Sequence, residues 1–153
     1  MKIIPILIFF AIFHTGFGQN ANMIIQVNDQ LVTFEISGMY LNFSNDDGQV
    51  ESNQVGYIPG ELVLNENVRQ KINSDSTKSI ILSFAYSNFE KKKEWHGHYK
   101  IELSKTLLDQ PYLILNIYDF QNKKYKRWYQ YLTDQDYLAE LRYPNSGIYV
   151  RQM

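Results

Sequence analysis

YLILNIYDF, residues 112–120, is an almost continuously apolar stretch near the middle of the C-terminal half of the chain. Alternate positions place Leu113, Leu115 and Ile117 on one face. The other face carries Tyr112, Ile114, Tyr118 and Phe120. A strand that is apolar on both faces is typical of the interior of a sheet covered on both sides. This stretch therefore predicts a central strand at the core of the fold.

Alternation of apolar and polar residues is the main pattern around this stretch. It is clearest at residues 79–87, where Ile80, Leu82, Phe84 and Tyr86 share one face and mainly small polar residues share the other. Such a period of two predicts a half-buried strand. The same pattern predicts further strands at residues 23–27, 32–37, 39–43, 61–65, 95–103, 125–132, 138–143 and 148–152.

Short turn signals separate these strands. Asn28-Asp29, the run from Asn45 to Gly48, Pro59-Gly60 and the run from Pro144 to Gly147 all favour tight turns, and Gly38 suits a bulge. Regular short strands with close turns predict an all-β fold, an antiparallel β-sandwich that is immunoglobulin-like or transthyretin-like in architecture.

Helical signals are few, and we expect at most one or two short helical turns. Ser104 can cap a brief turn that ends before Pro111, and Val68 with Ile72 can form one turn in the otherwise polar, exposed segment 65–75. Residues 134–142 fit either a strand or a helix, because Thr133 and Asp136 resemble a capping box. We prefer the strand.

The N-terminus has the features of a secretory signal peptide. Lys2 precedes an unbroken apolar run at residues 3–13, which is too short to span a bilayer as a helix, and Gly16 and Gly18 suit a cleavage site. We expect a signal peptide at residues 1–18, removed after Gly18, and one sandwich domain at residues 19–153. The alternative is an uncleaved anchor. The protein is accordingly predicted to be exported, to the periplasm or the extracellular space, with no membrane span after cleavage.

Composition excludes several classes of chemistry. The chain has no cysteine, so a disulfide framework, a cysteine zinc site, a thiol nucleophile and a lipid-modified cysteine are all ruled out. With Lys2 removed from the 15 basic residues, against 16 acidic ones, the formal charge becomes −2. That balance argues against nucleic-acid binding, since dedicated binders usually have a basic excess. We expect no cofactor.

One strand face carries a weak metal-binding pattern. Glu94, His96 and His98 alternate, so a strand would project all three from the same face, and two imidazoles with a carboxylate can bind zinc. Lys100 and Glu102 continue this face, which favours a solvated surface instead. No Gly-x-Ser-x-Gly motif accompanies these histidines, so a serine hydrolase is not indicated. A glycosidase needs a pair of carboxylates, for which Asp119, Glu140 and Glu102 are candidates, but their spacing in sequence does not indicate that they meet in space.

Tyrosine is abundant, with 12 in the chain, and several lie in the C-terminal part. Tyrosine joins apolar area to a polar tip, so an exposed row can stack on sugars or anchor a protein. The alternative is packing within the sheets. The weak ligand-binding set on the predicted strand is Tyr125, Arg127, Tyr129 and Tyr131.

These observations lead to one main hypothesis and two alternatives. The main hypothesis is an exported β-sandwich that acts as a non-catalytic binding module for a protein partner or a glycan. One alternative is metal-assisted hydrolysis at Glu94, His96 and His98. The other is a structural subunit of an envelope assembly that pairs with a partner through an exposed strand edge. The sequence does not fix the ligand, the strand order or the oligomeric state.

Overall fold

The computed structural model describes residues 20–88, 95–129, 132 and 134–146. The strands are β1 (Ala21–Val27), β2 (Gln30–Leu31), β3 (Ile36–Asn45), β4 (Val50–Gln54), β5 (Gly56–Ile58), β6 (Gly60–Val63), β7 (Thr77–Asn88), β8 (Trp95–Leu103), β9 (Leu113–Asp119) and β10 (Tyr137–Arg142). The helices are α1 (Glu66–Asn73), α2 (Lys105–Leu108) and α3 (Lys126–Tyr129).

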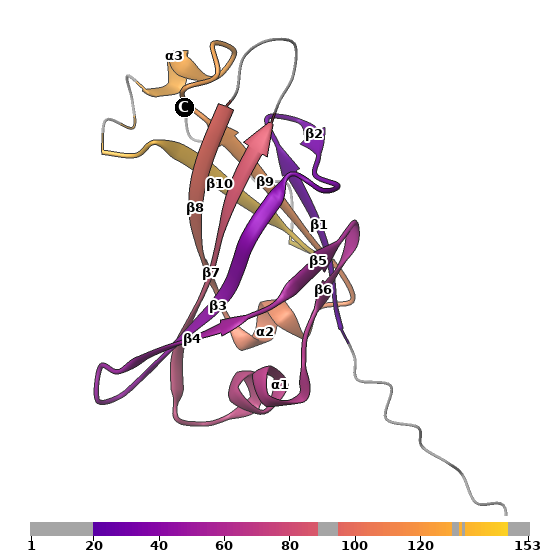
Figure 1. Cartoon of the computed structure of the whole chain (residues 1–153), viewed down its shortest axis with the longest axis vertical. Coiled ribbons are helices and arrows are strands. Elements are labelled where there is room, and N and C mark those ends of the chain that lie inside the picture. Colours follow the sequence, from indigo (N-terminus) through magenta and orange to yellow (C-terminus); the bar gives the residue numbers. More distant parts are fainter. Residues whose placement is uncertain (1–19, 89–94, 130–131, 133, 147–153) are drawn as a thin grey trace, which may run out of the picture.

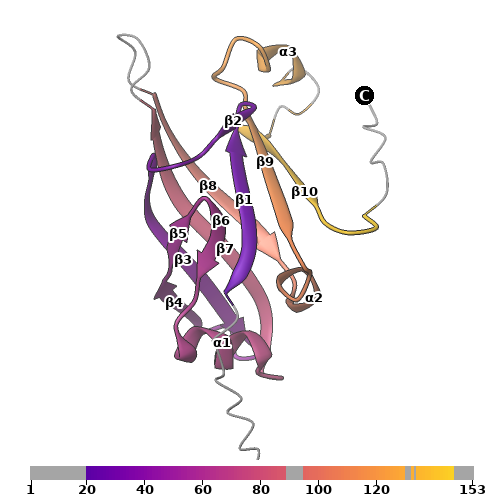
Figure 2. The same cartoon turned by 90° about the vertical axis from the view of Figure 1, so that its right-hand side faces the viewer.

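Two sheets pack face to face, as Figure 2 shows with the view along their edges. The first sheet has the order β10-β9-β1-β6-β5, with β2 added to the end of β1, and the second has the order β4-β3-β7-β8. The prediction of an all-β sandwich is confirmed. The preferred strand at residues 134–142 is also confirmed, because β10 pairs with β9 from Tyr137 to Arg142.

The apolar stretch at residues 112–120 contains the interior strand β9. It lies between β10 and β1, and its inward residues Leu113, Leu115 and Ile117 are almost fully buried. Its pairing with β1 is parallel, with Met23 opposite Leu113 and Val27 opposite Ile117, whereas the other strand pairs of the described chain are antiparallel. A parallel pair needs a long connection. Here the connection contains the whole second sheet together with β2, β5 and β6 of the first.

The core between the sheets follows the predicted alternation. Strand β7 buries Ile80, Leu82, Phe84 and Tyr86, while the residues between them are only half-buried. Burial of such side chains stabilises each by roughly 1.5–3 kcal/mol relative to exposure, so these alternate positions hold the two layers together.

The predicted turns also form. Asn28 and Asp29 adopt positive φ angles of 53° and 66° between β1 and β2, which suits a tight hairpin. Gly60, at φ 97°, follows Pro59 between β5 and β6. The register of β3 shifts between Ser37 and Tyr40, at the glycine for which a bulge was predicted.

Three predicted segments differ from the structure. The strand predicted at residues 32–37 is mostly a loop between β2 and β3. Segment 65–75 contains the two-turn helix α1, and Val68 and Ile72 are buried rather than exposed.

The strand predicted at residues 125–132 is wrong. Residues 126–129 form the short helix α3, and the side chain of Tyr125 is only 3% exposed. The reason lies at the end of β9, where the apolar rings of Tyr118, on the outer face of the strand, and Phe120, just beyond it, are buried by Tyr125. Tyr125 packs on them to form a second small core, with Leu132 and Leu138 at its margin.

The described part of the chain contains no helix that is both long enough and apolar enough to cross a membrane. The second strand of the predicted terminal hairpin, 148–152, and the predicted signal peptide, 1–18, lie outside the described residues. The turn expected before that strand is present, because the amide of Ser146 bonds the carbonyl of Tyr143.

Candidate functional site

Two loop segments meet at one end of the sandwich, the upper end in Figure 1, where β2 and α3 lie. Lys124 and Tyr125 both bond the carboxylate of Asp29, although 95 or more residues separate them in sequence. Asn88, at the end of β7, donates to Gln30 Oε1 at 3.1 Å. We call this region the loop end and define it as residues 28–35, 87–88 and 120–127. Side-chain contacts thus join segments that are distant in sequence.

The most exposed large apolar side chain of the described residues lies in this region. Phe34 is 86% exposed, and Leu31, three residues earlier, is 50% exposed. The alternation of Val32, Phe34 and Ile36 had predicted one shared face, but only Val32 is fully buried. Phe34 is therefore an apolar group held in solvent by its loop.

The backbone of that loop is fixed by Glu35. Its Oε2 accepts hydrogen bonds from the amides of Thr33, at 2.7 Å, and Phe34, at 3.0 Å. Its carbonyl oxygen accepts from the amide of Ser87 in β7 at 2.9 Å. Burial raises the pKa of Glu35, but the hydrogen bonds from the loop outweigh it, so its pKa lies below the usual value. The phenyl ring thus projects from an ordered turn.

The described members of the predicted ligand-binding set do not lie on a strand, as the sequence had indicated. Tyr125 is buried against Tyr118, with ring centroids 5.1 Å apart, so its ring faces the small core and not a ligand. Arg127 is exposed on α3. Tyr129 lies at the end of α3, and its side chain is outside the description, as is Tyr131 altogether.

The predicted histidine face is present on β8. His96 and His98 are both exposed, and Nδ1 of His96 lies 2.8 Å from the hydroxyl of Ser87 on the neighbouring strand. Glu94, the third member of the proposed metal set, lies outside the described residues. Among the residues that are described, no group of three or more ligating side chains could hold a metal ion.

The three carboxylates considered for a glycosidase pair lie on different surfaces. Asp119 points between the sheets, where its Oδ2 accepts from the hydroxyl of Tyr99 at 3.0 Å. Glu140 lies on the opposite face of the same sheet, bonded by Arg142 at 3.0 Å. Glu102 is exposed on the outer face of the second sheet. This arrangement provides no acid and base pair across a shared cleft.

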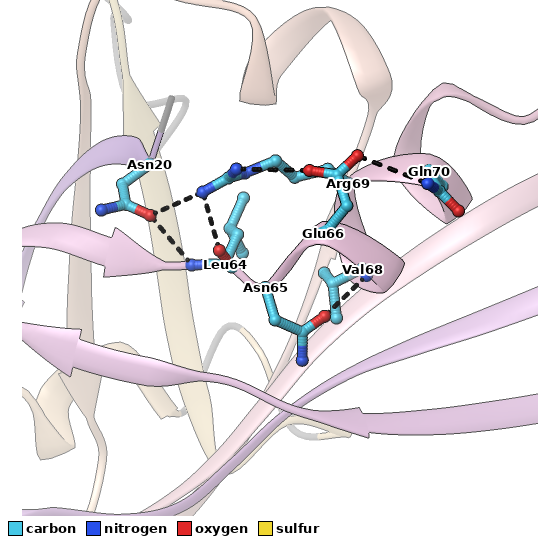
Figure 3. A network of polar contacts seen from close by, with 7 residues as sticks. All are labelled: Asn20, Leu64, Asn65, Glu66, Val68, Arg69 and Gln70. Atoms are coloured by element: carbon cyan, nitrogen blue, oxygen red, sulfur yellow. Dashed lines mark hydrogen bonds and ion pairs between the residues drawn. The ribbon is translucent and has the colours of Figure 1, made fainter. Parts of the chain in front are cut away.

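The other end of the molecule contains a cleft of about 940 Å³ between α1, α2 and the start of β1. Arg69 of α1 is one of its lining residues, and Figure 3 shows the polar contacts of this side chain. The Nη2 atom of Arg69 donates to the carbonyl of Leu64 at 2.8 Å and to Oδ1 of Asn20 at 3.2 Å, and Nη1 lies 3.7 Å from Glu66. These contacts tie α1 to the ends of β1 and β6. The guanidinium group of Arg69 therefore mainly stabilises the fold through these contacts.

The start of α1 explains why the arginine is held there. Asn65 caps the helix by accepting a hydrogen bond from the amide of Val68 at 2.9 Å (Figure 3). Val68 and Ile72 then bury one stripe of the helix. Arg69, the next residue after Val68, is thereby directed towards the first strand. The residues on this side of the cleft therefore connect α1 with the ends of β1 and β6.

Fold and loop end together define a β-sandwich protein that presents an ordered apolar loop at one end. Comparisons with protein-family models, with curated proteins and with solved structures return no match for this chain. Sequence reasoning missed Phe34 because its alternation with Val32 and Ile36 suits a strand. The available signal was Glu35 two residues after Thr33, a spacing at which a carboxylate can bond the loop amides.

Proposed function

We propose that this chain is an exported, non-catalytic binding module that engages a protein partner through its loop end. The observation that carries the proposal is Phe34, whose ring is 86% exposed on a loop held by Glu35. A single exposed apolar residue is common on protein surfaces. An aromatic ring on an ordered loop is different, because little conformational entropy is lost when a partner covers it.

The surroundings of Phe34 support a protein partner over a glycan. Leu31, three residues before Phe34, adds a second half-exposed apolar side chain to the loop end, and the exposed cations Lys126 and Arg127 lie on α3 at the same end (Figure 1). An apolar anchor with a charged rim is typical of protein interfaces. Sugar binding would favour exposed tyrosines, and Tyr125 of that predicted set is buried.

Export is part of the proposal. Lys2 and the apolar run at residues 3–13, followed by Gly16 and Gly18, support removal of residues 1–18. The expected product begins at Gln19. N-terminal sequencing and intact mass of protein recovered from the periplasm or culture medium test this directly, and recovery of the full chain from the membrane would favour an uncleaved anchor.

The binding surface is tested by site-specific photocrosslinking in cells of the native host. A photoreactive phenylalanine analogue at position 34 is expected to give a discrete adduct with one protein, identified by mass spectrometry. The matched control places the analogue at Tyr112, which is 46% exposed before the start of β9, away from the loop end. Purified partner should then bind the wild type and lose most affinity for Phe34→Ser, while Tyr112→Ser binds normally.

Two results would overturn the proposal. One is an equal pattern of adducts from positions 34 and 112, which would mean that Phe34 has no specific contact. The other is unchanged partner affinity in Phe34→Ser. A glycan that binds the protein independently of Phe34 would move the function to another surface.

A further inference from the structure

The edge strand β4 exposes backbone groups that are ready to pair. In the β3–β4 ladder, the amide of Val55 bonds the carbonyl of Met39, and the amide of Asn45 bonds the carbonyl of Gln49. Because backbone direction alternates along a strand, Glu51 and Asn53 also face β3. The amides and carbonyls of Val50, Ser52 and Gln54 therefore point away from the sheet.

This edge lacks the protection seen on the opposite edge of the same sheet. On β8, the hydroxyl of Tyr137 accepts from the amide of Lys100 and donates to its carbonyl, each at 2.8 Å, so the middle of that edge is occupied. The outward side chains of β8 include histidine, lysine and glutamate, which discourage pairing. In contrast, β4 has no lysine, arginine or proline, and Val50 is 67% exposed.

We propose that β4 pairs with β4 of a second copy of this chain, antiparallel and with Ser52 opposite Ser52 on a two-fold axis. In this register Val50 lies opposite Gln54 of the other copy, and all three outward residues exchange both backbone hydrogen bonds. The two second sheets then join into one continuous sheet. This inference is independent of the loop end, which lies elsewhere on the molecule.

The side chains support a second copy as the occupant. Glu51 lies opposite Asn53 of the other copy, so no like charges face each other across the axis. Lys71 of α1 already bonds both Glu51 and Asn53 of its own chain, which fixes these side chains and neutralises the carboxylate. The β3–β4 hairpin also projects from the body at the lower left of Figure 1, where a second copy can approach.

The test is the molecular mass of the purified protein in solution, measured by sedimentation equilibrium across micromolar concentrations. The wild type is expected to be a dimer. Ser52→Pro removes the central outward amide and should weaken dimerisation by about tenfold or more, because two ladder hydrogen bonds are lost. Ser52→Ala keeps that amide and is the matched control, which should remain dimeric.

Val50→Lys is a second variant that avoids the risk that proline prevents folding. It places a lysine on the edge strand, and natural edge strands use lysine to prevent pairing, so this variant should also be monomeric. Circular dichroism checks that each variant is folded. A wild type that stays monomeric at every concentration would overturn the proposal. Dimers that persist in both folded variants would do the same, because the interface would then lie elsewhere.

Discussion

The hydroxyl of Tyr99 on β8 donates a hydrogen bond to Oδ2 of Asp119 on β9, across 3.0 Å and inside the sandwich. Tyr99 is 1% exposed and Asp119 3% exposed, so this is a polar link between the two sheets within an apolar core. The second oxygen of Asp119 accepts from the amide of Gln121 at 2.7 Å. Both oxygens of the buried carboxylate are thereby bonded, as burial of such a group requires.

This link predicts an unusual dependence of stability on pH. Burial raises the pKa of Asp119 above 3.8, although hydrogen bonds from Gln121 and Tyr99 oppose the effect. The folded state then binds the proton more tightly than the unfolded chain. The contribution of Asp119 is fully present below about pH 3.8 and is lost as pH rises through its folded-state pKa.

The comparison that isolates this effect is wild type against Asp119→Asn, measured by urea unfolding over the acidic to neutral range. The unfolding free energy of the wild type should fall relative to the variant as pH rises. In Tyr99→Phe the loss should extend to higher pH, because one group that lowers the pKa is gone, and stability at neutral pH should drop by about 1–3 kcal/mol. A difference that stays constant with pH would show that Asp119 does not titrate in this way.

Gly97 makes room for Tyr99. A Cβ at position 97 would lie 2.3 Å from the hydroxyl of Tyr99 and 2.5 Å from its ring carbon Cζ. The tyrosine cannot move aside easily, because it is bonded to Asp119 and packs edge-on against Phe84 at 5.5 Å and Tyr137 at 5.0 Å. Gly97→Ala should destabilise the protein by about 2–4 kcal/mol in chemical denaturation.

The control for this substitution is Gly48→Ala. A Cβ there meets no atom within 4 Å, but the residue has φ 77°, so only backbone strain of about 1 kcal/mol is expected. Equal losses in the two variants would mean that Tyr99 adapts to the added methyl group.

Tyr137 contributes a different contact between the sheets, at the edge of β8. Its hydroxyl bonds both the amide and the carbonyl of Lys100. Tyr137→Phe leaves both backbone groups without this partner and should cost about 1–2 kcal/mol of unfolding free energy. Amide hydrogen exchange at Lys100 should also become faster. Tyr112→Phe, at a position that is 46% exposed, should change stability by less than about 0.5 kcal/mol, and a similar loss there would undermine this interpretation.

Glu35 predicts the opposite sign of pH dependence from Asp119. Its pKa lies below 4.5, because the loop hydrogen bonds outweigh the effect of burial. Its contribution is present above about pH 4.5 and is lost as pH falls through the lower folded-state pKa. Glu35→Gln should therefore differ from wild type at neutral pH, by less than about 1 kcal/mol, and converge with it in acid. Thermal unfolding of wild type and Glu35→Gln at neutral and at acidic pH measures this difference in stability. A difference that grows in acid would refute the lowered pKa of Glu35.

The histidine face makes a prediction about zinc. His96 and His98 are exposed, and Nδ1 of His96 is already close to the hydroxyl of Ser87. Calorimetric titration of the purified protein is expected to show only weak zinc binding, because the described residues bring no third ligand to the two exposed imidazoles. Tight stoichiometric binding that disappears in the double variant His96→Ala and His98→Ala would instead restore the metal-assisted hypothesis.

Much of the strand pattern could be predicted because it is local. The apolar residues at alternate positions, Ile80, Leu82, Phe84 and Tyr86, indicate which side of this strand faces the core. This pattern can be read from a few adjacent residues. The turn at Asn28 and Asp29 was equally accessible, since those residue types tolerate positive φ.

The candidate site was less accessible. Phe34 fits a strand pattern as well as Val32 does, but the amides of Thr33 and Phe34 donate to Glu35, and the carbonyl of Glu35 accepts from Ser87. Tyr125 fits an exposed row in sequence, but it packs on Tyr118 of β9 and on Phe120 just beyond that strand. In both cases the fold of a loop, and not the alternation within a strand, decides where the ring lies.

By itself, then, the sequence determined most of the strands, several turns and the all-β class, because a period of two and turn chemistry act over a few residues. The tertiary structure alone decided the parallel pairing of β1 with β9, the buried bond from Tyr99 to Asp119, and the capped edge of β8. Each of these joins segments from 20 to about 90 residues apart, and such contacts form only when the whole chain has packed its apolar faces together.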